Sequence, residues 1–171
     1  FQTREFEEKF ISEAIPYQVI GGPKFYERAE IRDLLAYFRV ILQPGDDLAF
    51  ERIINKPARG VGEKTLDKMR DFAAREQCSL FDAAARMVEQ GGLSGKAKAN
   101  LSELVRNFEE WRHILPAVSP DDLAAQVLEG SGYVDRLKND SSPDAEGRLE
   151  NLKELISVLT DKNKYPNLML E

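Results

Sequence analysis

The sequence has few of the residues that build catalytic and metal sites. Its 171 residues include one cysteine, Cys78, and one histidine, His113. A single cysteine excludes a disulfide within the chain and fits a reducing cytoplasm. One thiol and one imidazole far apart in sequence make no metal-ligand cluster and no Cys–His or Ser–His–Asp set. We therefore predict no catalytic residues and no metal site here, and we interpret His113 as a structural side chain.

Long apolar runs are also missing. No stretch approaches the ~20 apolar residues that a membrane-spanning helix requires, and the charged residues 3–9 do not fit a signal peptide. Hydrophobic residues make up 42% and charged residues 32%, which is typical of a globular chain rather than a disordered one. Because Phe1 is not a natural start, we expect a piece of a longer cytoplasmic protein with no membrane partner.

Positive charge is concentrated in one segment of an acidic chain. The net charge of the whole chain is -6. Residues 52–75 hold seven basic and three acidic side chains, a balance of +4, so the remaining residues together carry -10. A basic face on an acidic body fits contact with phosphates at one place rather than over the whole surface.

The basic segment is centred on Gly60-Val61-Gly62, just before a predicted helix. Glycines let the backbone bend sharply and approach a partner closely, and a helix start offers unpaired N–H groups and a positive dipole end. Such a turn suits a phosphate. It is not a P-loop, because Ala58 and Glu63 stand where that motif has glycines. It is not a dinucleotide motif either, because Thr65 replaces the third glycine.

Two interpretations of this turn stand on the residues alone. One is a helix–hairpin–helix-like element that holds a DNA backbone through main-chain N–H groups, with Lys56, Arg59, Lys64 and Lys68 available for phosphates. The other is a plain helix–helix connection whose glycines serve close packing. Residues 21–28 are similarly open: their aromatic rings fit stacking on bases or anchoring of a loop. If the rings anchor a loop, the charged residues among 27–33 are expected to form a solvated or interdomain ion-pair network.

The rest of the chain is predicted to be mostly helical, because apolar residues recur at three- and four-residue spacing. Residues 17–20 are the one expected strand, without a partner strand in this chain. Asp46 and Ser79 begin two helices, and residues 139–147 form a polar loop. Helices are expected at about residues 3–14, 29–42, 47–55, 63–75, 79–88, 95–115, 121–129, 133–138 and 148–160.

Five segments follow one another in a distinctive order along the chain. They are Gly21-Gly22-x-x-Phe25-Tyr26-x-Arg28-x-Glu30-Ile31-x-Asp33, Asp46-Asp47, Asn55-x-Pro57-x-Arg59-Gly60-Val61-Gly62-x-x-Thr65, Ser131-Gly132-Tyr133 and Arg148-Leu149-Glu150-Asn151-Leu152. In this order they resemble the UvrD/PcrA/Rep-type superfamily 1 DNA helicases over nearly the whole chain. The resemblance implies that residues 1–35 end subdomain 2A and that residues 36–171 belong to the helical insertion 2B. It implies a mainly α, multi-helix orthogonal bundle with one short N-terminal strand left from a truncated α/β subdomain.

The resemblance also implies a parent protein and its partners. The parent would be a bacterial ATP-dependent 3′-to-5′ DNA helicase acting in DNA repair, with ATP and Mg bound between other subdomains. This segment lacks the Walker motifs, so we expect no cofactor in it and no activity alone. The expected partners are double-stranded DNA at a fork junction, the remaining helicase subdomains and repair proteins.

In the helicase family, subdomain 2B grips duplex DNA through a Gly-x-Gly turn. That role maps onto Gly60, Val61 and Gly62, with Arg59 and Thr65 adjacent. The hinge between subdomains would include Gly21, Gly22, Phe25, Tyr26, Arg28 and Asp33.

A second hypothesis is a protein-interaction or autoinhibitory module of the same helicase with little intrinsic DNA affinity. Its support is the balance of -10 outside residues 52–75.

Overall fold

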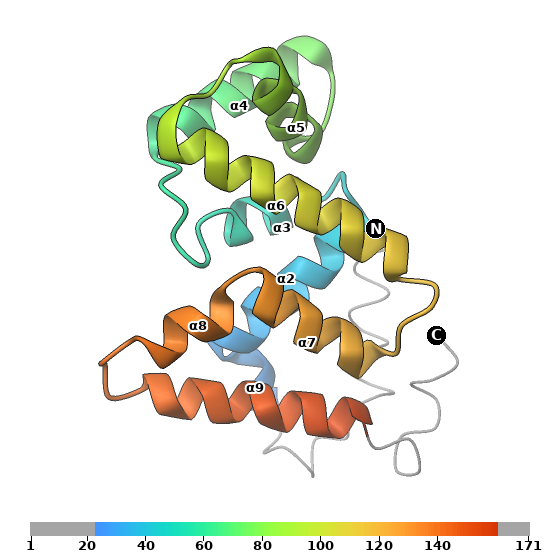
Figure 1. Ribbon diagram of the computed structural model, residues 1–171, viewed down its shortest axis with the longest axis vertical. Coiled ribbons are helices and arrows are strands. Elements are labelled where there is room, and N and C mark those ends of the chain that lie inside the picture. The colour runs from blue at the N-terminus through green and yellow to red at the C-terminus, as the bar shows by residue number, and fades with distance from the viewer. Residues whose placement is uncertain (1–22, 161–171) are drawn as a thin grey trace. The chain divides into compact units, whose positions relative to one another are not determined.

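The computed structural model describes residues 23–160 (Figure 1). Within this range the chain is helical and has no β-strand, so the prediction of a mainly α protein is confirmed. The predicted helix at residues 3–14 and strand at residues 17–20 lie outside the described residues, and the orthogonal-bundle arrangement stays a prediction. The elements are η2, a 3₁₀-helix (Pro23–Glu27), and the α-helices α2 (Ala29–Leu42), α3 (Asp47–Ile53), α4 (Glu63–Glu76), α5 (Leu80–Gln90), α6 (Gly95–Ile114), α7 (Pro120–Gly130), α8 (Tyr133–Lys138) and α9 (Ala145–Thr160).

The predicted helix starts at Asp46 and Ser79 are confirmed by their hydrogen bonds. Asp46 accepts from the N–H of Ala49 at 3.1 Å, and Ser79 accepts from the N–H of Asp82 at 3.1 Å. These are the bonds that an N-cap residue makes to the third residue beyond it.

The predicted loop at residues 139–147 is wrong at its end, because α9 already begins at Ala145. Ala145 is buried, so it extends the apolar face of the helix by one turn. Asp144 pairs with Arg148 at 3.0 Å across that same first turn. The polar sequence around these residues hid both features.

The described residues form two compact units. Unit 1 consists of residues 23–35 and 114–160, and unit 2 of residues 36–113, so one boundary falls inside α2 after Leu35. The sequence-based division also cuts after residue 35 but places residues 114–171 with residues 36–113. The assignment of residues to subdomains 2A and 2B stays a prediction.

An aromatic cluster forms the core of unit 2. Phe108 of α6 stacks on Tyr37 of α2 with ring centroids 5.7 Å apart. It also makes edge-to-face contacts with Phe81 of α5 at 5.8 Å and with Trp111 at 5.1 Å, and Phe50 of α3 meets Phe81 in the same way. Such pairs contribute about 0.5–1.5 kcal/mol each beyond the area they bury. The cluster therefore fixes the end of α3, from which the glycine turn departs.

Unit 1 is organised around α9, with α7 and α8 following one another along it (Figure 1). The first half of α2 contributes two buried carboxylates to this unit. Asp33 accepts a hydrogen bond from the Tyr133 hydroxyl at 2.6 Å, and Glu30 accepts one from the Asn151 amide at 2.7 Å. Both carboxylates are buried, so the expected solvated position is wrong for these two residues. The interdomain ion-pair network stays a prediction.

We expect Tyr133→Phe to lower the free energy of unfolding by about 1–3 kcal/mol at pH 7, because it removes one donor from a buried carboxylate. Burial, and then the hydrogen bond to Asp33, raise the pKa of Tyr133. The pKa of Tyr133 is higher in the folded chain than the value of about 10 that a tyrosine has in the unfolded chain. The protonated hydroxyl therefore stabilises the fold below about pH 10, and this stabilisation is lost as the pH rises above that value. Urea unfolding at neutral pH and above about pH 10 measures both effects. The variant should lose less stability than the parent at alkaline pH, and an equal loss would contradict the assignment.

Candidate nucleic-acid interface

The glycine turn joins α3 to α4 and is closed from inside by two asparagine side chains. The Asn55 side-chain oxygen accepts from the N–H groups of Arg59 at 3.1 Å and of Val61 at 3.2 Å, and its amide nitrogen donates to the Val61 carbonyl. Asn100 of α6 donates to the Arg59 carbonyl at 2.9 Å. Val61 itself is only 5% exposed and anchors the turn. These bonds fix the turn before any partner arrives, which lowers the entropic cost of binding.

The Arg59 side chain lies beneath the turn and not on the surface. It is 7% exposed, and it donates to the carbonyls of Ile53 at 2.7 Å and Ile54 at 3.1 Å. It also donates to the Tyr37 hydroxyl at 2.7 Å. The carbonyls at the end of a helix lack intrahelical partners, and a guanidinium supplies several donors in one plane. The expectation of a surface cation at position 59 is therefore corrected, and a role of Arg59 in DNA binding stays a prediction, as a residue that shapes the turn.

The two glycines leave the outer side of the turn bare. Gly60 has φ +74°, the left-handed region that favours glycine, whereas Gly62 is extended and is the N-cap of α4. A Cβ atom on either glycine would meet no described atom within 4 Å. The interpretation that these glycines serve close packing is therefore wrong among the described residues. Because Gly62 has no side chain to cap the helix, the N–H groups of Glu63, Lys64 and Thr65 receive no side-chain bond from the N-cap.

Three of the predicted cations are exposed around this bare backbone. The side chains of Lys56, Lys64 and Lys68 are exposed, whereas Thr65 is half-buried. The structure thus gathers most of the predicted set on one turn and the first two turns of α4. It divides the set into exposed groups, which suit an anion, and two buried anchors, Arg59 and Val61.

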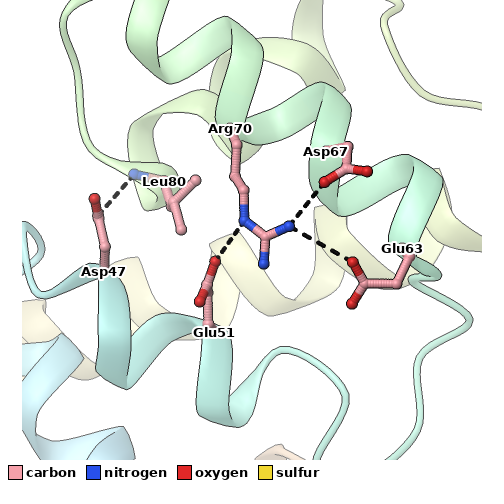
Figure 2. A network of polar contacts seen from close by, with 6 residues as sticks. All are labelled: Asp47, Glu51, Glu63, Asp67, Arg70 and Leu80. Carbon is pink, nitrogen blue, oxygen red and sulfur yellow. Dashed lines mark hydrogen bonds and ion pairs between the residues drawn. The ribbon is translucent and has the colours of Figure 1, made fainter.

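Arg70 of α4 forms ion pairs with several carboxylates, as Figure 2 shows. Its guanidinium lies 2.8 Å from Glu51 of α3, 2.8 Å from Asp67 and 3.6 Å from Glu63. The hydrogen bond to Glu51 is the main cause that raises the pKa of Arg70. The network contributes a fixed charge pattern at the start of α4, and it reduces the positive charge that the sequence assigns to residues 52–75.

Sequence reasoning missed the residues that support the turn. Asn55 belongs to the motif that resembles the helicases, so a signal was present for it. Tyr37 and Asn100 gave no signal, because they are 22 and 41 residues from Arg59 in sequence and reach it only through the fold.

The predicted hinge residues divide between described and undescribed positions. Gly21 and Gly22 lie outside the described residues. Phe25 and Tyr26 of η2 are buried and meet edge-to-face at 5.6 Å, so their rings anchor the loop and the base-stacking interpretation is wrong for them. Arg28 is exposed and Asp33 is buried. Their role in a hinge stays a prediction.

Within residues 23–160, no three His, Cys, Asp or Glu side chains gather closely enough to hold a metal ion. In the same part of the chain, every helix is too short or too polar to cross a membrane. His113 is exposed in the last turn of α6.

We expect Arg59→Met to lower the free energy of unfolding by about 2–4 kcal/mol, because it removes the donor from buried carbonyls that cannot regain water. Lys64→Met replaces an exposed cation of α4, so it should change the free energy of unfolding by less than about 0.5 kcal/mol. Urea unfolding followed by circular dichroism compares the two. Equal, small effects would contradict the buried role of Arg59.

The two glycines should respond differently to the same substitution. Gly60→Ala should cost about 1–2 kcal/mol, since an alanine is strained at its positive φ. Gly62→Ala has room and an allowed φ, so a modest loss of capping and a gain in backbone entropy should leave a change within about 1 kcal/mol. Thermal unfolding of both variants measures the difference. A larger loss of stability for Gly62→Ala than for Gly60→Ala would show that the backbone conformation at position 62, and not the absence of a side chain there, requires glycine.

Comparison with known proteins identifies a family for this chain. The UvrD-like helicase C-terminal domain family matches residues 1–170. The chain is 41% identical over 163 residues to a probable DNA helicase II homolog of Rickettsia felis, covering 95% of this chain and 25% of that protein. It is 40% identical to the ATP-dependent DNA helicase PcrA of Staphylococcus epidermidis, covering 94% and 22%, and 38% identical to PcrA of Bacillus subtilis, covering 92% and 21%. It thus spans about a quarter of the length of these relatives, and it belongs to the UvrD-like helicase C-terminal domain family.

Proposed function

We propose that this chain contacts duplex DNA for a larger helicase, through the turn formed by residues 59–62 and the start of α4. The contact is with the phosphate backbone and is independent of sequence. The observation that carries the proposal is the bare N-cap at Gly62, with uncapped N–H groups at the start of α4 and open space over both glycines. A helix start in this state favours a negative ligand.

Charge and rigidity around the turn support the same proposal. Lys56, Lys64 and Lys68 are exposed on either side of the glycines and suit phosphates. The asparagine bonds hold the backbone in place, so little ordering accompanies binding. We expect non-specific affinity, with a dissociation constant of roughly 10⁻⁴ to 10⁻⁶ M at physiological salt.

The parent's chemistry belongs to this proposal as well. By resemblance, the parent is a 3′-to-5′ helicase acting in DNA repair that uses ATP and Mg bound outside this segment. The segment then has a regulatory role, holding duplex at the fork junction while the rest of the helicase moves along the strand. Its partners are the remaining helicase subdomains and repair proteins.

A second candidate function is contact with protein, and one observation favours it. Among the basic residues in 52–75, Arg59 is buried and Arg70 is paired with Glu51 and Asp67. The exposed positive charge is therefore smaller than the sequence suggests. A module with a weakened basic face and an acidic remainder fits docking onto the parent or onto a repair protein.

We expect Gly62→Asp to separate stability from DNA binding. An aspartate at an N-cap bonds to the uncapped N–H groups and favours the helix dipole, so the free energy of unfolding should rise by up to about 1 kcal/mol. The same carboxylate takes the phosphate position, so affinity for a labelled duplex should fall at least about tenfold. Fluorescence anisotropy measures affinity, and urea unfolding measures stability.

The matched control is Gly147→Asp, which adds the same charge in the first turn of α9 in unit 1, at an exposed glycine with equal room. It should leave affinity within about twofold. For the unsubstituted chain, three lysine–phosphate contacts predict that affinity for the duplex falls about 40-fold as the salt concentration rises from about 50 to about 200 mM. The proposal would be contradicted if Gly62→Asp bound duplex as well as the unsubstituted chain does, or if the unsubstituted chain bound no duplex at low salt. Either result would favour the protein-contact function.

A further inference from the structure

We infer that Arg70 is a positioning residue that keeps the Glu63 carboxylate away from the phosphate position at the start of α4. The inference rests on the proposed function, because it describes how the same turn is kept available for an anion. Neither residue needs to touch DNA. Their interaction sets how strongly the turn attracts a phosphate.

Glu63 is the one acidic side chain in the first turn of α4 and directly follows the bare N-cap Gly62. The side chain of Glu63 is 81% exposed, so it has room to move. A carboxylate near a helix start is stabilised by the same N–H groups and the same dipole that attract a phosphate. Left alone, Glu63 would compete with a phosphate for these groups and would also repel it.

The geometry of Arg70 opposes this competition. Arg70 is seven residues after Glu63, so the two side chains lie on the same face of α4, two turns apart. Bonds of 2.8 Å to Glu51 of α3 and to Asp67 anchor the guanidinium (Figure 2). Its Nη1 atom then lies 3.6 Å from Glu63 and draws that carboxylate along the helix, away from the N-cap.

The three carboxylates are not equivalent. Glu51 and Asp67 make close, hydrogen-bonded contacts, whereas Glu63 makes the longest one and is the most exposed. Glu51 and Asp67 therefore hold Arg70 in position, and Glu63 is the group that Arg70 restrains. If Arg70 only braced α3 against α4, its removal would change stability without changing how Glu63 affects DNA binding.

A double-mutant cycle distinguishes these roles in the 171-residue chain. The variants are Glu63→Gln, Arg70→Gln and both together, and the measurement is anisotropy of a labelled duplex at low salt. We expect Glu63→Gln to raise affinity by less than about twofold in the parent and by about threefold to tenfold in the Arg70→Gln background. The second figure follows from a released like charge about 6 Å from a phosphate and from competition for the helix start.

The matched control is Arg75→Gln, which removes the same charge from the same helix. Arg75 lies over the Phe72 ring at 5.5 Å, and its exposed side chain belongs to a different part of α4. In this background, Glu63→Gln should raise affinity only as it does in the parent. Should Arg70→Gln fail to fold, the same cycle is run with Arg70→Lys, which keeps the charge but lacks the planar fork.

Equal effects of Glu63→Gln in the unsubstituted chain and in the Arg70→Gln background, or in the Arg70→Lys background where that variant replaces it, would overturn the inference. The proposed function stays intact in that case, provided Gly62→Asp still lowers affinity at least about tenfold. A parent that binds no duplex, or binds it regardless of Gly62→Asp, would overturn both. A larger effect of Glu63→Gln in the Arg70→Gln background than in the Arg75→Gln background would support the positioning role.

Discussion

The buried guanidinium of Arg59 connects parts of unit 2 that are distant in sequence. It binds the last carbonyls of α3 and the hydroxyl of Tyr37, whose ring stacks on Phe108 of α6. A buried charge is stable only where its donors meet acceptors, and here the end of a helix supplies acceptors that it cannot satisfy itself. The Arg59 side chain thereby bonds the end of α3, where the chain enters the glycine turn.

This arrangement separates the inner and outer sides of the turn. The polar groups on the inner side are bonded to Asn55, Asn100 and Arg59, whereas the outer side carries no side chain at Gly60 or Gly62. The conformational cost of forming the turn is met during folding. Under the proposed function, an anion meets donors already in place, which is the condition under which main-chain N–H groups bind anions well. The position of Gly62 is notable because its backbone angles suit any residue. The fold itself therefore does not explain the choice of glycine there.

Most of the helices were predictable from sequence, and the interior of the site was not. Apolar spacing of three and four residues located α2 and α8 with the bounds that the structure has, because packing on one face is a local, periodic property. The direction of a long polar side chain is not local. Arg59 stands among exposed cations in the sequence, and only the fold brings Tyr37 and the carbonyls of α3 within its reach. The predicted start of α9 was wrong for a related reason, because Ala145 is a single small buried residue and gives no periodic signal.

Charge counting therefore overstates the positive field at the turn. Of the cations in residues 52–75, Arg59 is buried beneath the turn, and Arg70 is shared among three carboxylates. What remains near the glycines is a small set of exposed lysines and the exposed Glu63, which lies 3.6 Å from Arg70. Modest net charge makes the attraction depend on where each carboxylate is held and not on the total, because exposed charges act over about one Debye length, about 8–10 Å at ordinary salt. Under the proposed function, an anion site of this kind is tuned by ion pairs that never touch the anion, and weak binding suits a duplex that must move.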